Sequence, residues 1–203
     1  MAIPTQYYEK SLVLLKPDAI QRGLIGEIIS KFERKGLKIV AMKMIWPTKE
    51  MAQLHYDWSE EEKIQTGNRS IQAYKEKGIE VNKSPIEIAE EVQKRLVSFL
   101  TAGPVVAMVI EGAHAIQHIR KLVGHGSPLN ADVGTIRADY TLDSYLMADE
   151  AERAARNLVH ASSSASEAER EIKVWFSEEE IYNYELAIEK ILYSLEWEQK
   201  NSN

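Results

Sequence analysis

The chain has 203 residues, a length typical of one domain of ordinary size or of two very small ones. It carries 25 basic and 31 acidic side chains for a formal net charge of −6, and 44% of its residues are hydrophobic. That apolar fraction is enough for a core and excludes a wholly disordered protein. The chain has no cysteine, which excludes a disulfide scaffold, a thiol nucleophile and a cysteine-ligated metal site.

Two further classes of protein are disfavoured. No apolar stretch approaches the roughly 20 residues of a membrane span, and the first residues lack the layout of a signal peptide. The acidic net charge argues against broad binding of nucleic acid. We therefore expect a cytoplasmic protein that binds neither membranes nor long nucleic acids.

The apolar pattern of the first half predicts alternating strands and helices. In order, we expect a buried strand at 11–16, a helix at 20–36, a strand at 37–46 and a short helix at 48–56. Residues 57–91 change character, because nine acids and five bases give them a net charge of −4. We interpret them as a surface insertion with helical pieces and not as a second core.

The second half continues the alternation. We expect a helix at 88–100, a central strand at 104–110, a helix at 116–124, a loop at 125–140, helix at 141–156, a short strand at 158–160 and helices at 165–176 and 188–195. This order fits a ferredoxin-like α+β fold: a split βαβ sandwich whose four-stranded antiparallel sheet carries helices on one face. We expect a single domain over 1–203, with a C-terminal helical extension at about 177–203.

One of the five histidines has informative neighbours. His160 ends a predicted buried strand, small residues able to open a helix follow it, and Glu171 lies one helical stretch further on. A carboxylate there would hold one ring nitrogen and leave the other as a nucleophile, next to helix N–H groups that favour phosphate. By itself this pattern leaves open a purely structural histidine. His55, His114, His118 and His125 have no distinctive company.

Several motifs in fixed order add specificity. They are Lys16-Pro17-Asp18, the strand Gly103–Gly112, Gly134-Thr135-Ile136-Arg137, Asn157-Leu158-Val159-His160-Ala161-Ser162, Glu171-Ile172 and Trp175-Phe176. Together they resemble nucleoside diphosphate kinase, whose signature reads Asn-x-x-His-[Gly/Ala]-Ser-Asp-Ser and then Ala-x-x-Glu-Ile-x-x-Trp-Phe. The resemblance covers roughly residues 8–56 and 92–180.

The resemblance implies a role for each matching residue. His160 would take the terminal phosphate of a nucleoside triphosphate and pass it to a nucleoside diphosphate, in ping-pong transfer through phosphohistidine. The other implied roles are phosphate binding for Lys16, Arg120 and Arg137, contact with the sugar for Asn157, orientation of the histidine for Glu171, and a place beside the nucleophile for Tyr56 and Ser162. Such a reaction needs positioning and positive charge, which arginine and lysine supply. The family also implies Mg²⁺ held mainly by the nucleotide phosphates, with no protein metal site.

Three positions depart from the family pattern. The expected aspartate after Ser162 is Ser163, the aromatic residue that stacks on the base falls at Val92, and an expected threonine of the phosphate site is Gly126. These departures keep a second hypothesis open: a non-catalytic nucleotide-binding or regulatory module on the same fold. An RNA-binding module is disfavoured, because its aromatic strand signature is absent and the net charge has the wrong sign.

The two insertions, 57–91 and 141–156, flank the expected nucleotide cleft. They are interpreted as peripheral helices, with a lid or an effect on base selectivity as the alternative. Family members form hexamers or tetramers, so the resemblance implies a homo-oligomer. The insertion 57–91 carries a net charge of −4 and the tail 177–203 one of −5, which leaves +3 for the remainder. The expected catalytic core is therefore mildly basic.

Overall fold

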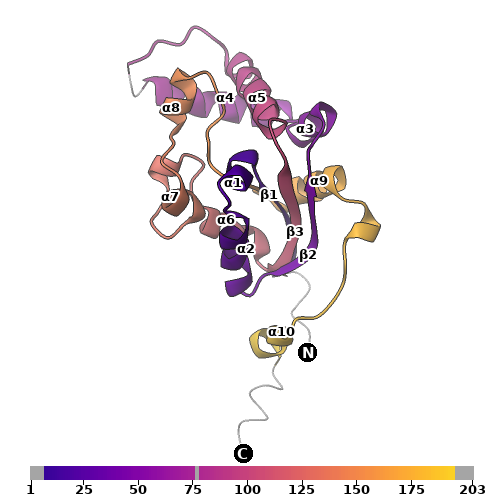
Figure 1. Ribbon diagram of the computed structural model, residues 1–203. Coiled ribbons are helices and arrows are strands. Elements are labelled where there is room, and N and C mark those ends of the chain that lie inside the picture. Colours follow the sequence, from indigo (N-terminus) through magenta and orange to yellow (C-terminus); the bar gives the residue numbers. More distant parts are fainter. Residues whose placement is uncertain (1–6, 76–77, 195–203) are drawn as a thin grey trace, which may run out of the picture.

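The computed structural model describes residues 7–75 and 78–194. One four-stranded sheet organises it (Figure 1). Its strands are β1 (Tyr8–Leu15), β2 (Lys38–Ile45), β3 (Val105–Ala113) and β4 (Val159–Ala161). They lie in the order β2-β3-β1-β4, and each neighbouring pair is antiparallel. The predicted four-stranded antiparallel α+β sheet is confirmed.

Helices connect and follow the strands. In the first half they are α1 (Pro17–Gln21), α2 (Ile25–Arg34), α3 (Lys49–His55), α4 (Glu60–Lys75) and α5 (Pro85–Leu100). In the second half they are α6 (Ala115–Val123), α7 (Ile136–Tyr140), α8 (Tyr145–Glu150), α9 (Ala165–Trp175) and α10 (Ala187–Tyr193), with 3-10 turns at Pro128–Asn130 and Glu178–Glu180.

Three details differ from the predicted helices. The helix expected over 20–36 is divided into α1 and α2, because Gly23 adopts a left-handed conformation with φ of 68°. The expected loop 125–140 contains α7, and the stretch 141–156 is helical only over α8. The predicted tail helix corresponds to α10, and its last residue, Leu195, lies outside the described residues.

Helices cover both faces of the sheet, so the prediction of helices on one face was wrong. Val13 and Leu15 of β1 pack in one core cluster with residues of α1, α2, α6 and α7. Leu12 and Leu14 point to the opposite face and pack with residues of α3, α5 and α9. Successive strand side chains alternate between faces, and all four of these are fully buried. A strand that is apolar at every position therefore requires a cover on both sides.

The insertion forms a helical hairpin at one end of the molecule. Helix α5 begins with a capping box, in which the Ser84 side chain accepts from the Glu87 backbone N–H and the Glu87 carboxylate accepts from the Ser84 backbone N–H. Helices α4 and α5 pack closely at Gly67, where an added Cβ would lie 1.9 Å from the carbonyl oxygen of Pro85. Helix α8 lies beside this hairpin (Figure 1).

The C-terminal segment runs along β2 toward the opposite end of the molecule (Figure 1). The Tyr182 backbone N–H donates to the Val40 carbonyl, and the Tyr184 hydroxyl donates to that of Ile39. Lys38 and Lys43 pair with Glu189 and Glu180 of this segment. Among the described residues, no helix is long and apolar enough to cross a membrane.

Candidate active site

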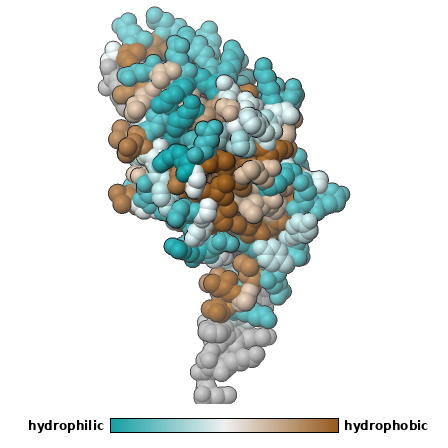
Figure 2. Space-filling view, in the orientation of Figure 1, coloured by the Kyte–Doolittle hydropathy of each residue, from teal (hydrophilic) through white to brown (hydrophobic). Residues whose placement is uncertain are grey.

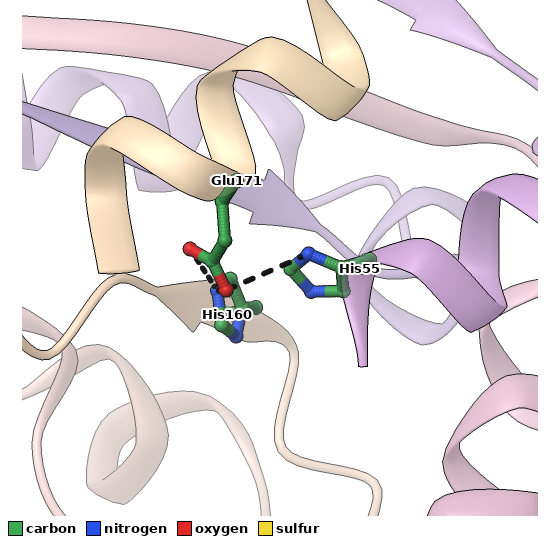
Figure 3. A group of neighbouring side chains, drawn as sticks. All are labelled: His55, His160 and Glu171. Atoms are coloured by element: carbon green, nitrogen blue, oxygen red, sulfur yellow. Dashed lines mark hydrogen bonds and ion pairs between the residues drawn. The ribbon is translucent and has the colours of Figure 1, made fainter. Parts of the chain in front are cut away.

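His160 lies in the middle of β4, where it pairs with Leu14 of the central strand β1. Its side chain is 17% exposed, and its Nε2 atom lies 2.8 Å and 3.0 Å from the two carboxylate oxygens of Glu171 on α9 (Figure 3). The Ser162 hydroxyl donates to the same carboxylate over 2.6 Å. The short strand and the following helix thus bring together the histidine and the acid that the sequence paired.

The environment keeps the imidazole neutral. Burial lowers the pKa of His160 well below its ordinary value, and the nearby charges of Lys16, Arg137 and Arg120 lower it further, while Glu167 opposes them. A neutral ring has one N–H, and the carboxylate draws it to Nε2. Nδ1 then keeps a lone pair, and no described residue hydrogen-bonds to it. Such a nitrogen is suited to nucleophilic attack.

His55 is a member of this cluster that the sequence analysis missed. Its Nδ1 lies 3.5 Å from Glu171 (Figure 3). The same nitrogen accepts from the indole N–H of Trp175. The His55 and His160 rings meet edge to face, with centroids 4.4 Å apart. The side chain is fully buried, and burial holds its pKa well below the ordinary value. The signal for it was weak, because only its position before Tyr56 pointed to the site.

Tyr56 lies beside His55, with ring centroids 4.6 Å apart. It is 5% exposed, and burial raises the pKa of its hydroxyl, with a further contribution from the charge of Glu171. The His55 ring thus contacts both Tyr56 and His160. Tyr56 is therefore placed to support the cluster as a neutral phenol.

Lys16, Asn157 and Arg137 form a polar group next to His160. Lys16 Nζ donates to the Asn157 side-chain oxygen over 2.7 Å, and Asn157 Nδ2 donates to the Gly126 carbonyl over 2.6 Å. Arg137 of α7 donates to the carbonyls of Gly124, Asn157 and Val159, and so joins α7 to the strand that carries the histidine. Burial lowers the pKa of Lys16 to about 7 and that of Arg137 to about 10. An anion bound here would stabilise the charged forms of both side chains, which burial disfavours.

Arg120 and Val92 lie further out. Arg120 is an exposed residue in the last turn of α6, and its positive charge contributes to lowering the pKa of both Arg137 and His160. Val92 is half-buried on α5 and lines a cavity beside α8. The structure thus gathers five predicted residues at one place, Lys16, Asn157, Arg137, Glu171 and His160, with Gly126 at its edge.

The matches to known proteins agree with this geometry. A family model described as nucleoside diphosphate kinase matches residues 9–74 and 87–181. A nucleoside diphosphate kinase of Pyrobaculum aerophilum is 49% identical over 178 residues, which are 85% of this chain and 97% of that protein. One from Archaeoglobus fulgidus is 44% identical over 185 residues, or 91% and 97% of the two chains. This chain belongs to the nucleoside diphosphate kinase family.

Solved structures of the family have the same fold. The NDP kinase structure from Pyrobaculum aerophilum aligns with a TM-score of 0.83 at 47% identity, covering 87% of this chain and all of that one. A nucleoside-diphosphate kinase from Borrelia burgdorferi, a transition state mimic with bound vanadate and ADP, aligns with a TM-score of 0.76 at 33% identity, over 92% and 97% of the two chains. The family resemblance predicted from the motifs is confirmed.

The structure gives a physical reason for the departure at Gly126. A Cβ on Gly126 would lie 2.0 Å from the hydroxyl oxygen of Tyr145, the first residue of α8. A threonine therefore does not fit here, and a tyrosine hydroxyl from the second insertion occupies its place. Sequence analysis missed Tyr145, although a glycine followed by an insertion carrying an aromatic residue was a usable signal.

The departure at Ser163 is accompanied by a carboxylate four residues later. The Ser163 backbone N–H and hydroxyl both donate to Glu167 Oε2 at the start of α9. The charge of Glu167 also opposes the lowering of the His160 pKa that burial causes. A negative charge is therefore retained near the position where the family pattern has aspartate, although it comes from the helix and not from the loop.

Proposed function

We propose that this protein is an active nucleoside diphosphate kinase and that His160 carries the phosphoryl group. The observation that supports this most directly is the His160–Glu171 pair, which leaves Nδ1 free beside Lys16, Asn157 and Arg137. In the first half-reaction the Nδ1 lone pair forms a bond to the terminal phosphorus. The bond from that phosphorus to its bridging oxygen breaks, and the nucleoside diphosphate leaves with the electron pair. The second half-reaction reverses these steps on another nucleoside diphosphate.

Each neighbouring residue has a role in this proposal. Lys16, Arg137 and Arg120 hold the phosphates, because a loose phosphoryl transition state is stabilised by positioning and positive charge. Asn157 contacts the sugar, and Gly126 with Tyr145 forms the edge of the phosphate site. Val92 contacts the base. Glu171 orients His160 and stabilises the positive charge that the ring gains on phosphorylation, with Tyr56 and His55 packed behind it.

Magnesium fits this site as a companion of the nucleotide. The carboxylates of Asp18 and Glu171 already have partners within the protein: both oxygens of Asp18 accept backbone N–H groups, and both oxygens of Glu171 face His160. The phosphates of the nucleotide would therefore be the main ligands of the ion. Mg²⁺ typically keeps several waters and binds substrate phosphates together with few protein ligands. We propose that Lys16 and Arg137 position the phosphates that carry the ion. When bound, Mg²⁺ neutralises part of the phosphate charge.

Phosphotransfer assays separate this function from that of a non-catalytic module. The protein is incubated with ATP and magnesium, freed of nucleotide and mixed with a nucleoside diphosphate. We expect an acid-labile phosphoryl group that moves to the diphosphate, its absence in His160→Ala, and its retention in the matched variant His118→Ala on α6. A protein without labile phosphate would favour the non-catalytic module, whereas a His160→Ala variant that still transfers phosphate would rule out His160 as the carrier.

A homo-oligomer and a cytoplasmic location stay predictions. Strand β2 is an edge of the sheet, and Met42, Met44 and the following Trp46 are all more than half exposed. In Figure 2 apolar side chains gather over the part of the molecule where β2 runs. An exposed apolar edge of this kind favours association. Light scattering of the purified protein tests it, and a monomer at micromolar concentration would contradict it.

A further inference from the structure

The hydroxyl oxygen of Tyr145, the first residue of α8, occupies the space in which a side chain at position 126 would lie. A Cβ added to Gly126 would be 2.0 Å from this oxygen and 3.2 Å from the ring carbon that bears it. The ring is 45% exposed and lies beside the His125 ring, with centroids 6.2 Å apart. Among residues 7–75 and 78–194, no group is hydrogen-bonded to the hydroxyl, so it is free to donate to a ligand.

The loop beside this hydroxyl belongs to the phosphate site. The Gly126 carbonyl accepts from the Asn157 side chain over 2.6 Å, and the Asn157 side chain accepts from Lys16 Nζ over 2.7 Å. The carbonyl two residues before Gly126 accepts from the Arg137 guanidinium over 2.9 Å. The Tyr145 hydroxyl is therefore a neutral donor on the loop that joins Arg137 to the Lys16–Asn157 pair. The oxygens of an ionised phosphate only accept hydrogen bonds, so a phosphate held by the two cations matches a third donor here.

A buried aspartate fixes the backbone that carries Tyr145. The Asp143 carboxylate accepts from the Arg153 guanidinium over 2.6 Å and 2.9 Å, and from the Arg156 backbone N–H over 2.6 Å. These bonds join the start of the second insertion to its end. On the side of the loop, the Tyr145 backbone N–H donates to the Ser127 hydroxyl over 3.4 Å. The insertion thus holds the tyrosine against this loop from two directions, which preorganises the hydroxyl.

We propose that the Tyr145 hydroxyl donates a hydrogen bond to a phosphate oxygen of the bound nucleotide, an inference that rests on the proposed kinase function. The second insertion, 141–156, then supplies a phosphate ligand and is not only a peripheral helix. A hydrogen bond to an ionised oxygen contributes more binding free energy than one between neutral groups. Because the hydroxyl already lies at the loop, little ordering is needed when the nucleotide binds. The proposal also accounts for Gly126, since any larger residue there would displace the donor.

Calorimetric titration of the full chain with ADP and Mg²⁺ tests the contact without requiring phosphotransfer. Tyr145→Phe keeps the ring and removes only the hydroxyl, so we expect the dissociation constant of ADP to rise about tenfold. Its melting temperature should not change, because the hydroxyl has no partner among the described residues. Tyr182→Phe, at an exposed tyrosine of the C-terminal segment, should bind ADP like the unmodified protein. An unchanged ADP affinity in Tyr145→Phe would overturn the proposal.

A nucleotide without sugar hydroxyls distinguishes the phosphate from the sugar as the acceptor. The 2′,3′-dideoxy form of ADP keeps both phosphates and lacks the two hydroxyls of the ribose. Tyr145→Phe should therefore weaken binding of this nucleotide by the same factor of about ten as binding of ADP. A loss that is seen with ADP and absent with the dideoxy nucleotide would place the tyrosine on the sugar and contradict the assignment to phosphate.

A threonine at position 126 provides a rescue that depends on the hydroxyl alone. Tyr145→Ala removes the ring together with the donor and should weaken ADP binding at least as much as Tyr145→Phe. The Gly126 backbone lies outside the left-handed region, and the three atoms nearest to an added Cβ all belong to Tyr145. Adding Gly126→Thr to Tyr145→Ala should therefore restore the ADP affinity to within about threefold of the unmodified protein. A double variant that binds ADP as weakly as Tyr145→Ala would contradict the role of a hydroxyl at this place.

Failure of this inference and failure of the proposed function give different results. Normal formation and transfer of phosphohistidine, with ADP binding unaffected by Tyr145→Phe, would leave the kinase standing and remove the tyrosine contact. A protein that forms no phosphohistidine, and in which Tyr145→Phe weakens binding of both nucleotides, would remove the kinase and leave the contact.

Discussion

Lys16 combines deep burial with a position at the phosphate site. Its pKa is lowered to about 7, mainly by burial and then by the charge of Arg137, so the free protein loses this positive charge as pH rises through neutrality. We expect binding of ADP to weaken progressively between pH 7 and pH 9. In Lys16→Met binding should be weaker throughout and lack this pH dependence. Calorimetry at constant ionic strength measures both, and Lys173→Met, at an exposed lysine of α9, is the control that should behave like the unmodified protein.

The same ionisation affects stability with a defined sign. Below pH 7 the folded and unfolded states both carry a charged Lys16, and the folded state bears the full cost of burying it. Between about pH 7 and 10.5 the unfolded state binds more protons at this group, so its contribution to stability rises with pH. The difference in free energy of unfolding between the unmodified protein and Lys16→Met should therefore move in favour of the unmodified protein over this range. Urea unfolding at several pH values tests this, and a constant difference would contradict it.

Tyr145 and Gly126 form a pair that can be exchanged only together. Gly126→Thr alone forces a Cβ to 2.0 Å from the Tyr145 hydroxyl, so we expect it to destabilise the protein by about 1–3 kcal/mol. Tyr145→Ala removes the clash, and the double variant should regain much of that loss. A double-mutant cycle from thermal unfolding measures the coupling energy. Strictly additive effects of the two substitutions would mean that the tyrosine does not fill the place of the threonine.

At the scale of elements, the α4–α5 hairpin depends on a close approach at Gly67. Because an added Cβ would lie 1.9 Å from the Pro85 carbonyl, Gly67→Ala should separate the helices and cost about 1–3 kcal/mol, despite the better helix propensity of alanine. Gly26 of α2 is the matched control, since no atom lies within 4 Å of an added Cβ there. Gly26→Ala should stabilise the protein by about 0.5–1 kcal/mol. Equal effects of the two substitutions on urea unfolding would argue against tight packing of the hairpin.

The order of the elements was predictable, because it depends on local periodicity and punctuation. Pro47 with Thr48 placed the start of α3, where the Thr48 side chain accepts from the Met51 backbone as a cap. The cover on both faces of the sheet was missed, although the unbroken apolar run Leu12–Leu15 already implied it. The break at Gly23 depends on a left-handed φ, which periodicity does not report.

The candidate site divides in the same way. Asn157, His160 and Glu171 lie close together in the sequence, and Lys16 and Arg137 lie in separate motifs, so the family resemblance identified all five. His55 and Tyr145 come from other elements and reach the site only through packing of α3 against α9 and of α8 against the loop at Gly126. The sequence carried only indirect signals for these two residues, since the contacts that give them a role are made in three dimensions.

At the scale of the whole molecule, the acidic tail is a partner of the sheet. The sequence analysis placed a net charge of −5 on residues 177–203 and interpreted them as an addition to a basic core. Part of that charge is neutralised on β2, where Lys38 lies 3.0 Å from Glu189 and 3.1 Å from Glu111, and Lys43 lies 2.6 Å from Glu180. Lys38 is almost fully buried between the rings of Tyr8 and Tyr184. These ion pairs therefore help to hold residues 180–189 on the sheet.

This arrangement predicts release of the tail at acid pH. Lys38 and the Tyr8 hydroxyl hold the pKa of Glu189 below its ordinary value, so its contribution to docking is present above about pH 4.5 and is lost as pH falls through the folded-state pKa. The hydrogen-exchange protection factors of residues 182–194 should fall between pH 5 and pH 3, before those of β1 and β3. Glu189→Gln should lower these protection factors already at pH 7. Lys38→Met should lower them more strongly, because this variant leaves the two largely buried carboxylates of Glu111 and Glu189 without their cation. Lys10→Met removes only the exposed side of the Glu111 pair and should leave the tail protected. A tail that loses protection only together with the central strands would show that apolar packing, and not this ion pair, holds it in place.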